Sequence, residues 1–336
     1  MEVVRGWTHR QFPLTETSGV GEVRRYAARL ATEMEWSELE VGRLAIVVTE
    51  LGSNLHKHAH NGRLLVGASA ERAQVEIVAI DDGPGIANVA SSMRDGYSTG
   101  GTPGTGLGAA RRLADDFDLH SASPGGTVCV ARLRKPGATP QLGNFRIGAI
   151  CLPAPGEDVC GDAWAAALDA SGVTLLVADG LGHGPGAAEA SQAAIDLFAE
   201  SPTLPLPAQV EQLHRGLRKT RGAALCCARL DTEAASVRFS GAGNISGRII
   251  SGTHDRSFVT ANGTAGLQIR NPSVNTVERP AHALMVLHSD GIVTRWDSTA
   301  LLPLLGRDPT LIAALLLRDH SRLRDDATVV VIQPRD

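Results

Sequence analysis

Two stretches near the start of the chain carry apolar residues at every third or fourth position, which predicts two amphipathic helices. The apolar positions of the first stretch are Val20, Val23, Ala27, Leu30 and Met34. The second stretch begins with a capping box, Ser37-Glu38-Leu39-Glu40, and turns one apolar face inward. That face consists of Leu44, Val47, Val48, Leu51 and Leu55. We expect a strand and a loop before these helices.

The pattern after the two helices indicates short strands around a glycine-rich stretch. Strands are expected at 63–70, 74–80, 119–122 and 127–133. The glycine-rich stretch covers 82–108 and leads into an expected helix at 111–117. Helices combined with a largely antiparallel sheet give an α+β fold, here a sandwich of one helical layer and one sheet.

The second part of the chain is richer in strand patterns. They are expected at 145–152, 163–168, 173–178, 223–230, 236–240, 246–250, 283–288 and 327–332. Helical patterns lie between them, at 186–199, 208–218, 298–305 and 309–320. Many strands with helices in pairs predict a β-sandwich covered by helices.

Composition and charge narrow the class of protein. Of 336 residues, 43% are hydrophobic and 20% are charged, and the formal net charge of −4 gives no general attraction to nucleic acid or to anionic membranes. No stretch approaches the ~20 apolar residues of a transmembrane helix, and the first residues lack the apolar core of a signal peptide. The five cysteines are scattered, which argues against disulfides or a zinc site. We expect a soluble, cytoplasmic protein with no nucleic-acid or membrane partner.

Three features of the first part together predict an ATP site. Glu50 and Asn54 share one helix face, where a carboxylate and an amide can hold magnesium beside phosphates. In Asp81-Asp82-Gly83-Pro84-Gly85, an aspartate at a strand end can accept a hydrogen bond from an exocyclic amine, and the glycines let a flat ring approach the backbone. Gly104-Thr105-Gly106-Leu107-Gly108 opens a helix whose free N–H groups suit a polyphosphate. Each feature alone has an ordinary explanation: a solvated helix face, a turn or a flexible connection.

In this order and spacing, the three features resemble the GHKL ATPase superfamily, and most closely its small anti-sigma-factor serine kinases of the RsbW and RsbT type. The resemblance covers about residues 10–134 and implies a Bergerat-type α/β sandwich that binds ATP with Mg²⁺. By it, Asn54 would bind magnesium, Glu50 would polarise the attacking hydroxyl, and Asp81 would contact adenine. The residues that would shape the pocket and its lid are Gly83, Gly85, Gly104, Gly106 and Gly108, with Thr127 completing the adenine side. A sensor histidine kinase is disfavoured, because too few residues precede the first box for a phosphoacceptor helix.

Four acidic sites lie at expected strand ends in the second part. They are Gly161-Asp162, Asp179-Gly180, Ser289-Asp290-Gly291 and Asp325-Asp326. A single Asp-Gly pair is usually a turn, but four such sites beside apolar strands favour a common role. Carboxylates that converge bind hard divalent cations through oxygen. Two such ions about 4 Å apart can activate a water and clamp a phosphoryl oxygen, so that no nucleophilic side chain is needed.

The acidic pattern resembles PPM-type metal-dependent serine/threonine phosphatases of the bacterial SpoIIE branch. The stretches that carry the likeness are 157–164, 178–184 and 325–329, with 219–224 and 241–245 resembling the small RsbX phosphatase. The likeness covers about residues 143–334 and implies an α-β-β-α fold with two Mn²⁺ or Mg²⁺ ions. Its implied metal ligands are Asp162, Asp179, the Gly180 carbonyl, Asp290 and Asp325, with Asp326 orienting its neighbour. Eukaryotic relatives carry a histidine directly after the Asp-Gly pair; here Leu181 follows, and a general-acid role for His183 stays open.

We therefore expect a bacterial partner-switching regulator. Residues 10–134 would form an ATP-binding, kinase-like domain, 135–142 a linker, and 143–334 a phosphatase domain, because 132–141 hold two prolines, a glycine and a basic cluster. The substrate would be a phosphorylated STAS-type protein, either an anti-sigma-factor antagonist or a stressosome scaffold. The first domain would phosphorylate or dock the same partner, and residues 1–134 and 142–336 would fold independently. A homo-oligomer is compatible with the sequence.

One alternative is a non-enzymatic, ATP-responsive switch that only binds anti-sigma or STAS proteins. The presence of all four acidic motifs and all three ATP boxes argues against it. A DNA-processing ATPase is disfavoured, because the chain has neither a basic patch nor a transducer domain.

Overall fold

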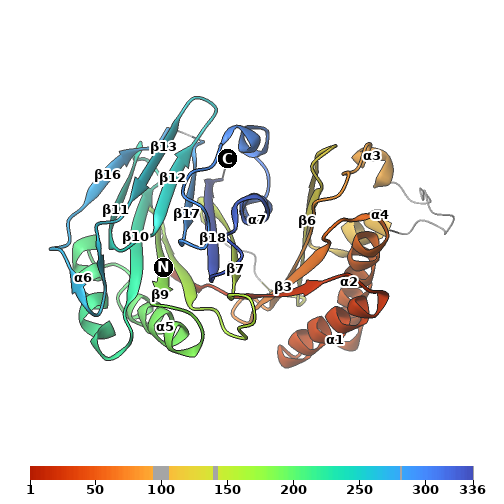
Figure 1. Ribbon diagram of the computed structural model, residues 1–336, viewed down its shortest axis with the longest axis horizontal. Coiled ribbons are helices and arrows are strands. Elements are labelled where there is room, and N and C mark those ends of the chain that lie inside the picture. Colours follow the sequence, from red (N-terminus) through yellow and green to blue (C-terminus); the bar gives the residue numbers. More distant parts are fainter. Residues whose placement is uncertain (94–105, 139–142, 281, 336) are drawn as a thin grey trace. The chain divides into compact units, whose positions relative to one another are not determined.

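The computed structural model describes residues 1–93, 106–138, 143–280 and 282–335. The chain divides into two compact units (Figure 1). One consists of His9–Pro140 and contains one large sheet; we call it the one-sheet unit. The other combines Met1–Thr8 with Gln141–Asp336 and contains two large sheets; we call it the two-sheet unit.

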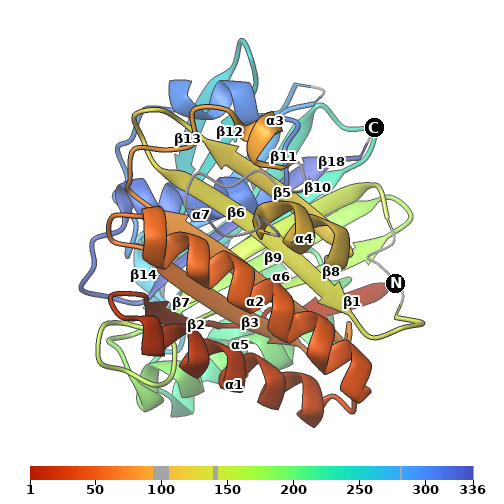
Figure 2. The ribbon, with the colours of Figure 1, turned by 90° about the vertical axis from the view of Figure 1, so that its right-hand side faces the viewer.

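The one-sheet unit is an antiparallel sheet with helices on one face, as Figure 2 shows from the helical side. Its strand order is β2-β3-β4-β6-β5. The elements are β2 (His9–Pro13), α1 (Thr17–Glu33), α2 (Glu38–His58), β3 (Arg63–Ser69), β4 (Gln74–Asp81), α3 (Val89–Ser92), α4 (Gly106–Leu113), β5 (Asp116–Ser121) and β6 (Thr127–Arg134). The α+β sandwich predicted from the pattern is confirmed.

The two long helices form for the reasons that the sequence indicates. Ser37 caps α2, because its Oγ accepts a hydrogen bond from the Glu40 amide at 3.3 Å. All five apolar positions predicted for the inner face of α2 are buried against the sheet. The prediction of a helix at 111–117 is wrong at its end: α4 stops at Leu113, and Asp116–Ser121 forms β5, which pairs with β6.

The two-sheet unit is an α-β-β-α sandwich, as predicted. One sheet has the order β1-β8-β9-β10-β11-β16 and the other β13-β12-β17-β18-β7. Helices α5 (Pro185–Glu200) and α6 (Leu206–Gly216) cover the first sheet, and α7 (Pro309–His320) covers the second (Figure 1). The strands are β1 (Glu2–Arg5), β7 (Phe145–Leu152), β8 (Asp162–Asp169), β9 (Gly172–Gly180), β10 (Ala223–Asp231), β11 (Ser236–Ala242), β12 (Ser246–Ile250), β13 (Asp255–Val259), β16 (Asn275–Glu278), β17 (Leu284–His288) and β18 (Ala327–Pro334), beside the short pair β14 (Gly263–Thr264) and β15 (Gln268–Ile269). Two 3₁₀ turns, at Leu217–Lys219 and Thr299–Leu304, complete the unit.

The first strand of the chain belongs to the two-sheet unit. β1 pairs with β8 in antiparallel register, from Glu2 opposite Leu168 to Arg5 opposite Ala165. Trp7 is buried, with its ring centroid 5.4 Å from that of Trp164. The one-sheet unit is therefore inserted between two strands of the two-sheet unit. A division into 1–134 and 142–336 would therefore separate β1 from its sheet, so the first eight residues belong with the second fragment and not with the first.

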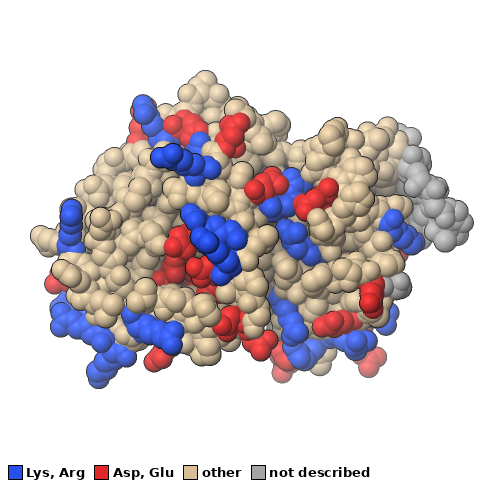
Figure 3. Space-filling model, viewed as in Figure 1, with Lys and Arg blue, Asp and Glu red and all other residues tan. Residues whose placement is uncertain are grey.

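None of the helices within the described ranges is long and apolar enough to cross a lipid bilayer. On the face shown in Figure 3, Lys and Arg side chains are interspersed with Asp and Glu side chains, without a large area of one sign.

Candidate functional site

Two of the predicted metal ligands face one another across neighbouring strands. Asp162 begins β8 and lies directly opposite Asp179, near the end of β9. Asp290 follows β17, and Asp325 and Asp326 precede β18, so these three approach from the second sheet. The antiparallel order thus brings all four predicted acidic motifs to the same end of the sandwich.

Hydrogen bonds between and within the two sheets orient the carboxylates at this end of the sandwich. Ser289 Oγ donates to Asp162 Oδ2 at 2.6 Å and accepts from the Thr328 amide at 3.0 Å. Asp326 Oδ1 accepts a hydrogen bond from the Ala154 amide at 2.8 Å. Asp162 is thus oriented by a residue from the opposite sheet, whereas Asp326 is held by the segment that follows β7 in its own sheet.

The glycines of the acidic motifs allow close backbone packing. A Cβ on Gly180 would lie 2.1 Å from the Ala187 carbonyl oxygen, and one on Gly291 would lie 2.0 Å from the Asp326 carbonyl oxygen. Both distances are too short for any side chain. Glycine at these positions therefore lets the turn after β17 lie against the segment before β18, and the end of β9 against α5.

Burial and like charge strongly perturb the carboxyl groups. The pKa of Asp179 is raised to about 9, mainly by desolvation and in addition by the charges of Asp162, Asp290, Asp325 and Asp326. Desolvation raises the pKa of Asp162 to about 7, although the Ser289 hydroxyl opposes the change. The pKa values of Asp290 and Asp326 are also raised, mainly by burial. The fold therefore disfavours the fully ionised form of this group of carboxyl side chains.

These residues fit divalent cations. Asp162 Oδ1 and Asp326 Oδ2 are buried and have no hydrogen-bond partner among the described residues. The donors are all oxygens, which suit Mn²⁺ or Mg²⁺ better than zinc. No group of three acidic, histidine or cysteine side chains in the described ranges already has the arrangement of a metal-ligand cluster.

A histidine–carboxylate pair lies in the neighbouring loops. His183 Nδ1 is 2.6 Å from Glu157 Oε1, and the His183 side chain is 61% exposed. Gly184, at φ +74°, leaves room for the Glu157 carboxylate, which a Cβ there would approach to 2.9 Å. The sequence analysis named His183 but not its partner.

The predicted ATP residues that the structure describes come from α2, from α4, and from the end of β4 and the start of β6 in the one-sheet unit. Glu50 and Asn54 are four residues apart on α2, and both are half-buried. Asp81 ends β4 opposite Thr127, the first residue of β6. The Asp82 amide donates to the His60 carbonyl at 3.0 Å, which ties the turn after β4 to the chain just beyond α2.

The turn after β4 is shaped by hydrogen bonds and glycines. The buried Asp81 accepts a hydrogen bond from the Gly83 amide at 2.7 Å. Gly85 has φ +74°, and a Cβ there would lie 2.0 Å from the Ala122 carbonyl oxygen. Asn54 Nδ2 is buried without a hydrogen-bond partner among the described residues, as suits a group that awaits a ligand.

The glycine-rich box is described only in part. Gly106 begins α4, and Gly108 is buried in the same helix, which packs against α2. Gly104 lies outside the described residues.

Comparisons with known proteins identify both units. Residues 12–133 match the family model of the histidine kinase-like ATPase domain. The serine/threonine-protein kinase RsbT of Bacillus subtilis (strain 168) is 33% identical over 106 residues, which are 31% of this chain and 80% of RsbT. The chain belongs to the RsbT family of histidine kinase-like ATPases. Residues 169–335 of this RsbT-family chain match the family model of stage II sporulation protein E, and the two-sheet unit is a SpoIIE-type serine/threonine phosphatase domain.

Two solved structures share a fold with more than half of the RsbT-family chain. One comes from work that describes the bacterial stressosome as a modular system adapted to control secondary messenger signaling; it is 28% identical, with a TM-score of 0.53, and the match covers 56% of this chain and 99% of that one. The other is RsbX in complex with magnesium, 21% identical, with a TM-score of 0.52, covering 58% of this chain and 98% of that one. The second likeness concerns the fold alone.

Two supporting residues of the acidic end were not predicted as functional in the RsbT-family chain. Asn244 Nδ2 donates to Asp290 Oδ2 at 2.6 Å, and Ser289 orients Asp162. Both lie within motifs that the sequence analysis singled out, but their partners are 46 and 127 residues away in the sequence. Pairs at such separations follow from the fold and not from local spacing.

Proposed function

We propose that this chain removes phosphate from phosphoserine or phosphothreonine of a STAS-domain protein, either an anti-sigma-factor antagonist or a stressosome scaffold. The supporting observation is the gathering of strongly perturbed carboxyl groups at one end of a SpoIIE-type sandwich. The partner class is supported by the relatives, since RsbT is a protein kinase and a similar structure comes from the stressosome.

In this proposal, the ligands of two Mn²⁺ or Mg²⁺ ions are Asp162, Asp179, the Gly180 carbonyl, Asp290 and Asp325. When bound, such ions activate a water molecule and neutralise charge on the phosphoryl oxygens. Ser289 and Asn244 orient Asp162 and Asp290, so that their oxygens face the same site. Asp326 is fixed by the Ala154 amide, its Oδ2 is buried without a hydrogen-bond partner among the described residues, and its amide orients Asp325 by donating to Oδ1 at 3.0 Å.

Phosphate release from a phosphorylated STAS-domain protein and from p-nitrophenyl phosphate tests the proposal. We expect turnover with Mn²⁺, none in EDTA, and loss of at least two orders of magnitude in Asp179→Asn. The matched control is Asp158→Asn, an exposed carboxylate in the loop before β8, which should keep full activity. Activity in EDTA, or full activity of Asp179→Asn, would contradict the proposal. Tight binding of the partner without any turnover would favour the non-enzymatic switch.

We further propose that the one-sheet unit binds ATP with Mg²⁺ and can phosphorylate the same partner. Asn54 would hold magnesium, Glu50 would polarise the attacking hydroxyl, and Asp81 with Thr127 would hold the adenine. Support comes from the unpartnered Asn54 amide on the helix face that also carries Glu50. Transfer of labelled phosphate from ATP to an unphosphorylated STAS-domain protein, absent in Glu50→Gln, tests the kinase role. Failure of the wild-type chain to bind Mg·ATP would refute the nucleotide site itself.

A further inference from the structure

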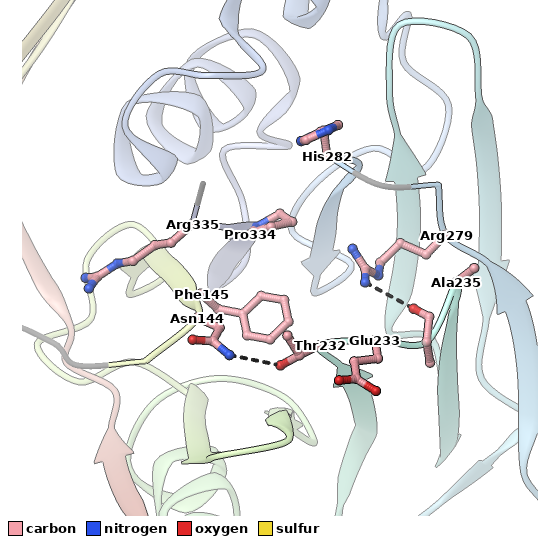
Figure 4. A pocket seen from close by; sticks show the side chains of 10 residues that line it. Asn144, Phe145, Thr232, Glu233, Ala235, Arg279, His282, Pro334 and Arg335 are labelled. Atoms are coloured by element: carbon pink, nitrogen blue, oxygen red, sulfur yellow. Dashed lines mark hydrogen bonds between the residues drawn. The ribbon is translucent and has the colours of Figure 1, made fainter.

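The two-sheet unit has a concave site at the opposite end of its strands from the acidic residues. A pocket of about 350 Å³ lies beside the start of β7, the end of β10 and the end of β18. Its lining comes from four separate segments, represented by Phe145, Thr232, Arg279 and Pro334 (Figure 4). Pockets of this size hold small organic molecules.

The pocket contains a buried guanidinium. Arg279 is only 5% exposed, and Figure 4 shows its guanidinium and the Phe145 ring pointing toward one another. Its Nη2 donates to the carbonyl oxygens of Asp231 and Ala234, at 3.3 and 3.1 Å. Its Nε is buried and has no hydrogen-bond partner among the described residues. The carbonyl contacts fix the guanidinium in place but leave one buried donor unused.

The positive charge of Arg279 also has no carboxylate partner within the described ranges. Asp231 is the acidic group that acts on it, and both Asp231 oxygens are engaged, by Arg229 and Arg238 at 2.8 Å each. Burial lowers the pKa of Arg279, and Asp231 offsets this only in part. Glu233 lines the pocket, but its carboxylate extends away from the space between Phe145 and Arg279 (Figure 4). A buried cation without a paired anion is costly, and an anion supplied from outside would remove that cost.

We propose that this pocket is a binding site for a small organic anion, whose acidic group pairs with Arg279 and whose flat apolar part packs on Phe145 and Pro334. The pairing uses the unmatched Nε donor, which gives a charge-assisted hydrogen bond. The site is distinct from the acidic end, since β7 and β18 each run the full length of the sheet between the two places.

Ligand-observed ¹⁹F NMR on the full chain in EDTA tests the proposal, because removal of divalent cations prevents the acid groups from binding at the acidic end. The probes are 4-fluorobenzoate, 4-fluorophenylphosphonate and the neutral 4-fluorobenzamide. We expect the two anions to bind and the amide to bind at least tenfold more weakly. The relative affinities of 4-fluorobenzoate and 4-fluorophenylphosphonate show whether the pocket prefers a carboxylate or a phosphonate. Equal binding of benzoate and benzamide, or no binding of either anion up to about 10 mM, would overturn the proposal.

Variants locate the bound probe. Arg279→Gln should reduce the affinity for 4-fluorobenzoate at least tenfold. Because Arg279 also holds two carbonyls, Ala235→Glu provides a second variant, at an exposed lining position where a negative charge repels the anion without disturbing packing. Glu233→Gln is the matched control and should bind as the wild type does. Unchanged binding in both Arg279→Gln and Ala235→Glu would place the probe elsewhere and refute the site.

Discussion

Replacement of Asp179 by its neutral isostere should abolish hydrolysis and yet make the metal-free chain more stable. Asp179 is surrounded by four other carboxyl groups and largely removed from water, so its ionised form is disfavoured in the folded state. Asparagine keeps the shape and removes the charge. The substitution therefore removes the free-energy cost of burying an ionisable carboxyl group among like charges.

The size of the gain follows from the pKa. It rises from 3.8 to about 9 on folding, so at pH 7 the folded chain holds a proton that the unfolded chain releases. Three pH units correspond to about 4 kcal/mol, which is an upper limit because neighbouring carboxyl groups share the proton. The penalty is absent below about pH 4 and grows as the pH rises toward 9. The stabilisation by Asp179→Asn should therefore grow over that interval.

Urea denaturation in EDTA at pH 5 and pH 8 measures this difference. Asp169→Asn is a control of opposite sign, because the bidentate contact with Arg229, at 2.8 and 3.0 Å, lowers the pKa of Asp169 and its loss should destabilise the fold. Addition of Mn²⁺ should stabilise the wild type and have little effect on Asp179→Asn. An Asp179→Asn chain that is less stable than wild type in EDTA, or a difference that does not grow with pH, would refute the electrostatic reasoning.

Three further predictions concern the separation and coupling of the two sites and the stability of the two-sheet unit. Asn54→Ala should weaken Mg·ATP binding at least tenfold by calorimetry. The same variant should hydrolyse p-nitrophenyl phosphate within about twofold of the wild-type rate, because the two sites lie in different units. A parallel loss of ATP binding and hydrolysis would contradict this separation. ATP should change the rate on a phosphorylated STAS-domain protein but not on the small ester, and equal ATP-independent rates on the protein would rule out coupling. Trp7→Ala should destabilise the two-sheet unit by about 3–5 kcal/mol in a thermal melt, because Trp7 packs on Trp164 in its core; Leu39→Ala, at a position 79% exposed, is the control that should change little.

Local pattern was sufficient for the strongest elements of the fold. Phe145–Leu152, Ser246–Ile250 and Pro309–His320 have the bounds that their apolar runs predict. The end of α4 was misjudged because a helical pattern continues through Phe117, while pairing with β6 draws that residue into β5. The strands between 255 and 278 were missed because they are mostly exposed; in β13, for example, only Phe258 is buried. In the first case a tertiary contact overrides the local pattern, and in the second the alternation of apolar and polar residues is too weak to predict a strand.

Part of the candidate site could likewise be predicted from local sequence, and part could not. The carboxylates could be found because an aspartate beside a glycine at the end of an apolar strand is a local signal. Their orientation by Ser289 and Asn244 could not be found, since each contact joins residues far apart in the sequence. The pairing of β1 with β8 could not be predicted for the same reason, because nothing in the local pattern of Glu2-Val3-Val4-Arg5 indicates which sheet this strand joins.

The insertion between β1 and β7 sets an order for folding during synthesis. β1 is made first, but its partner β8 appears only after the whole one-sheet unit, which can complete all its own strand pairs in the meantime. Closing an unstructured loop of about 130 residues would cost roughly 4 kcal/mol in chain entropy. A folded insert holds its two ends at a fixed separation and avoids most of that cost. Early folding of the insert should therefore lower the entropy cost of pairing β1 with β8, and a ligand that stabilises the insert should hasten that pairing.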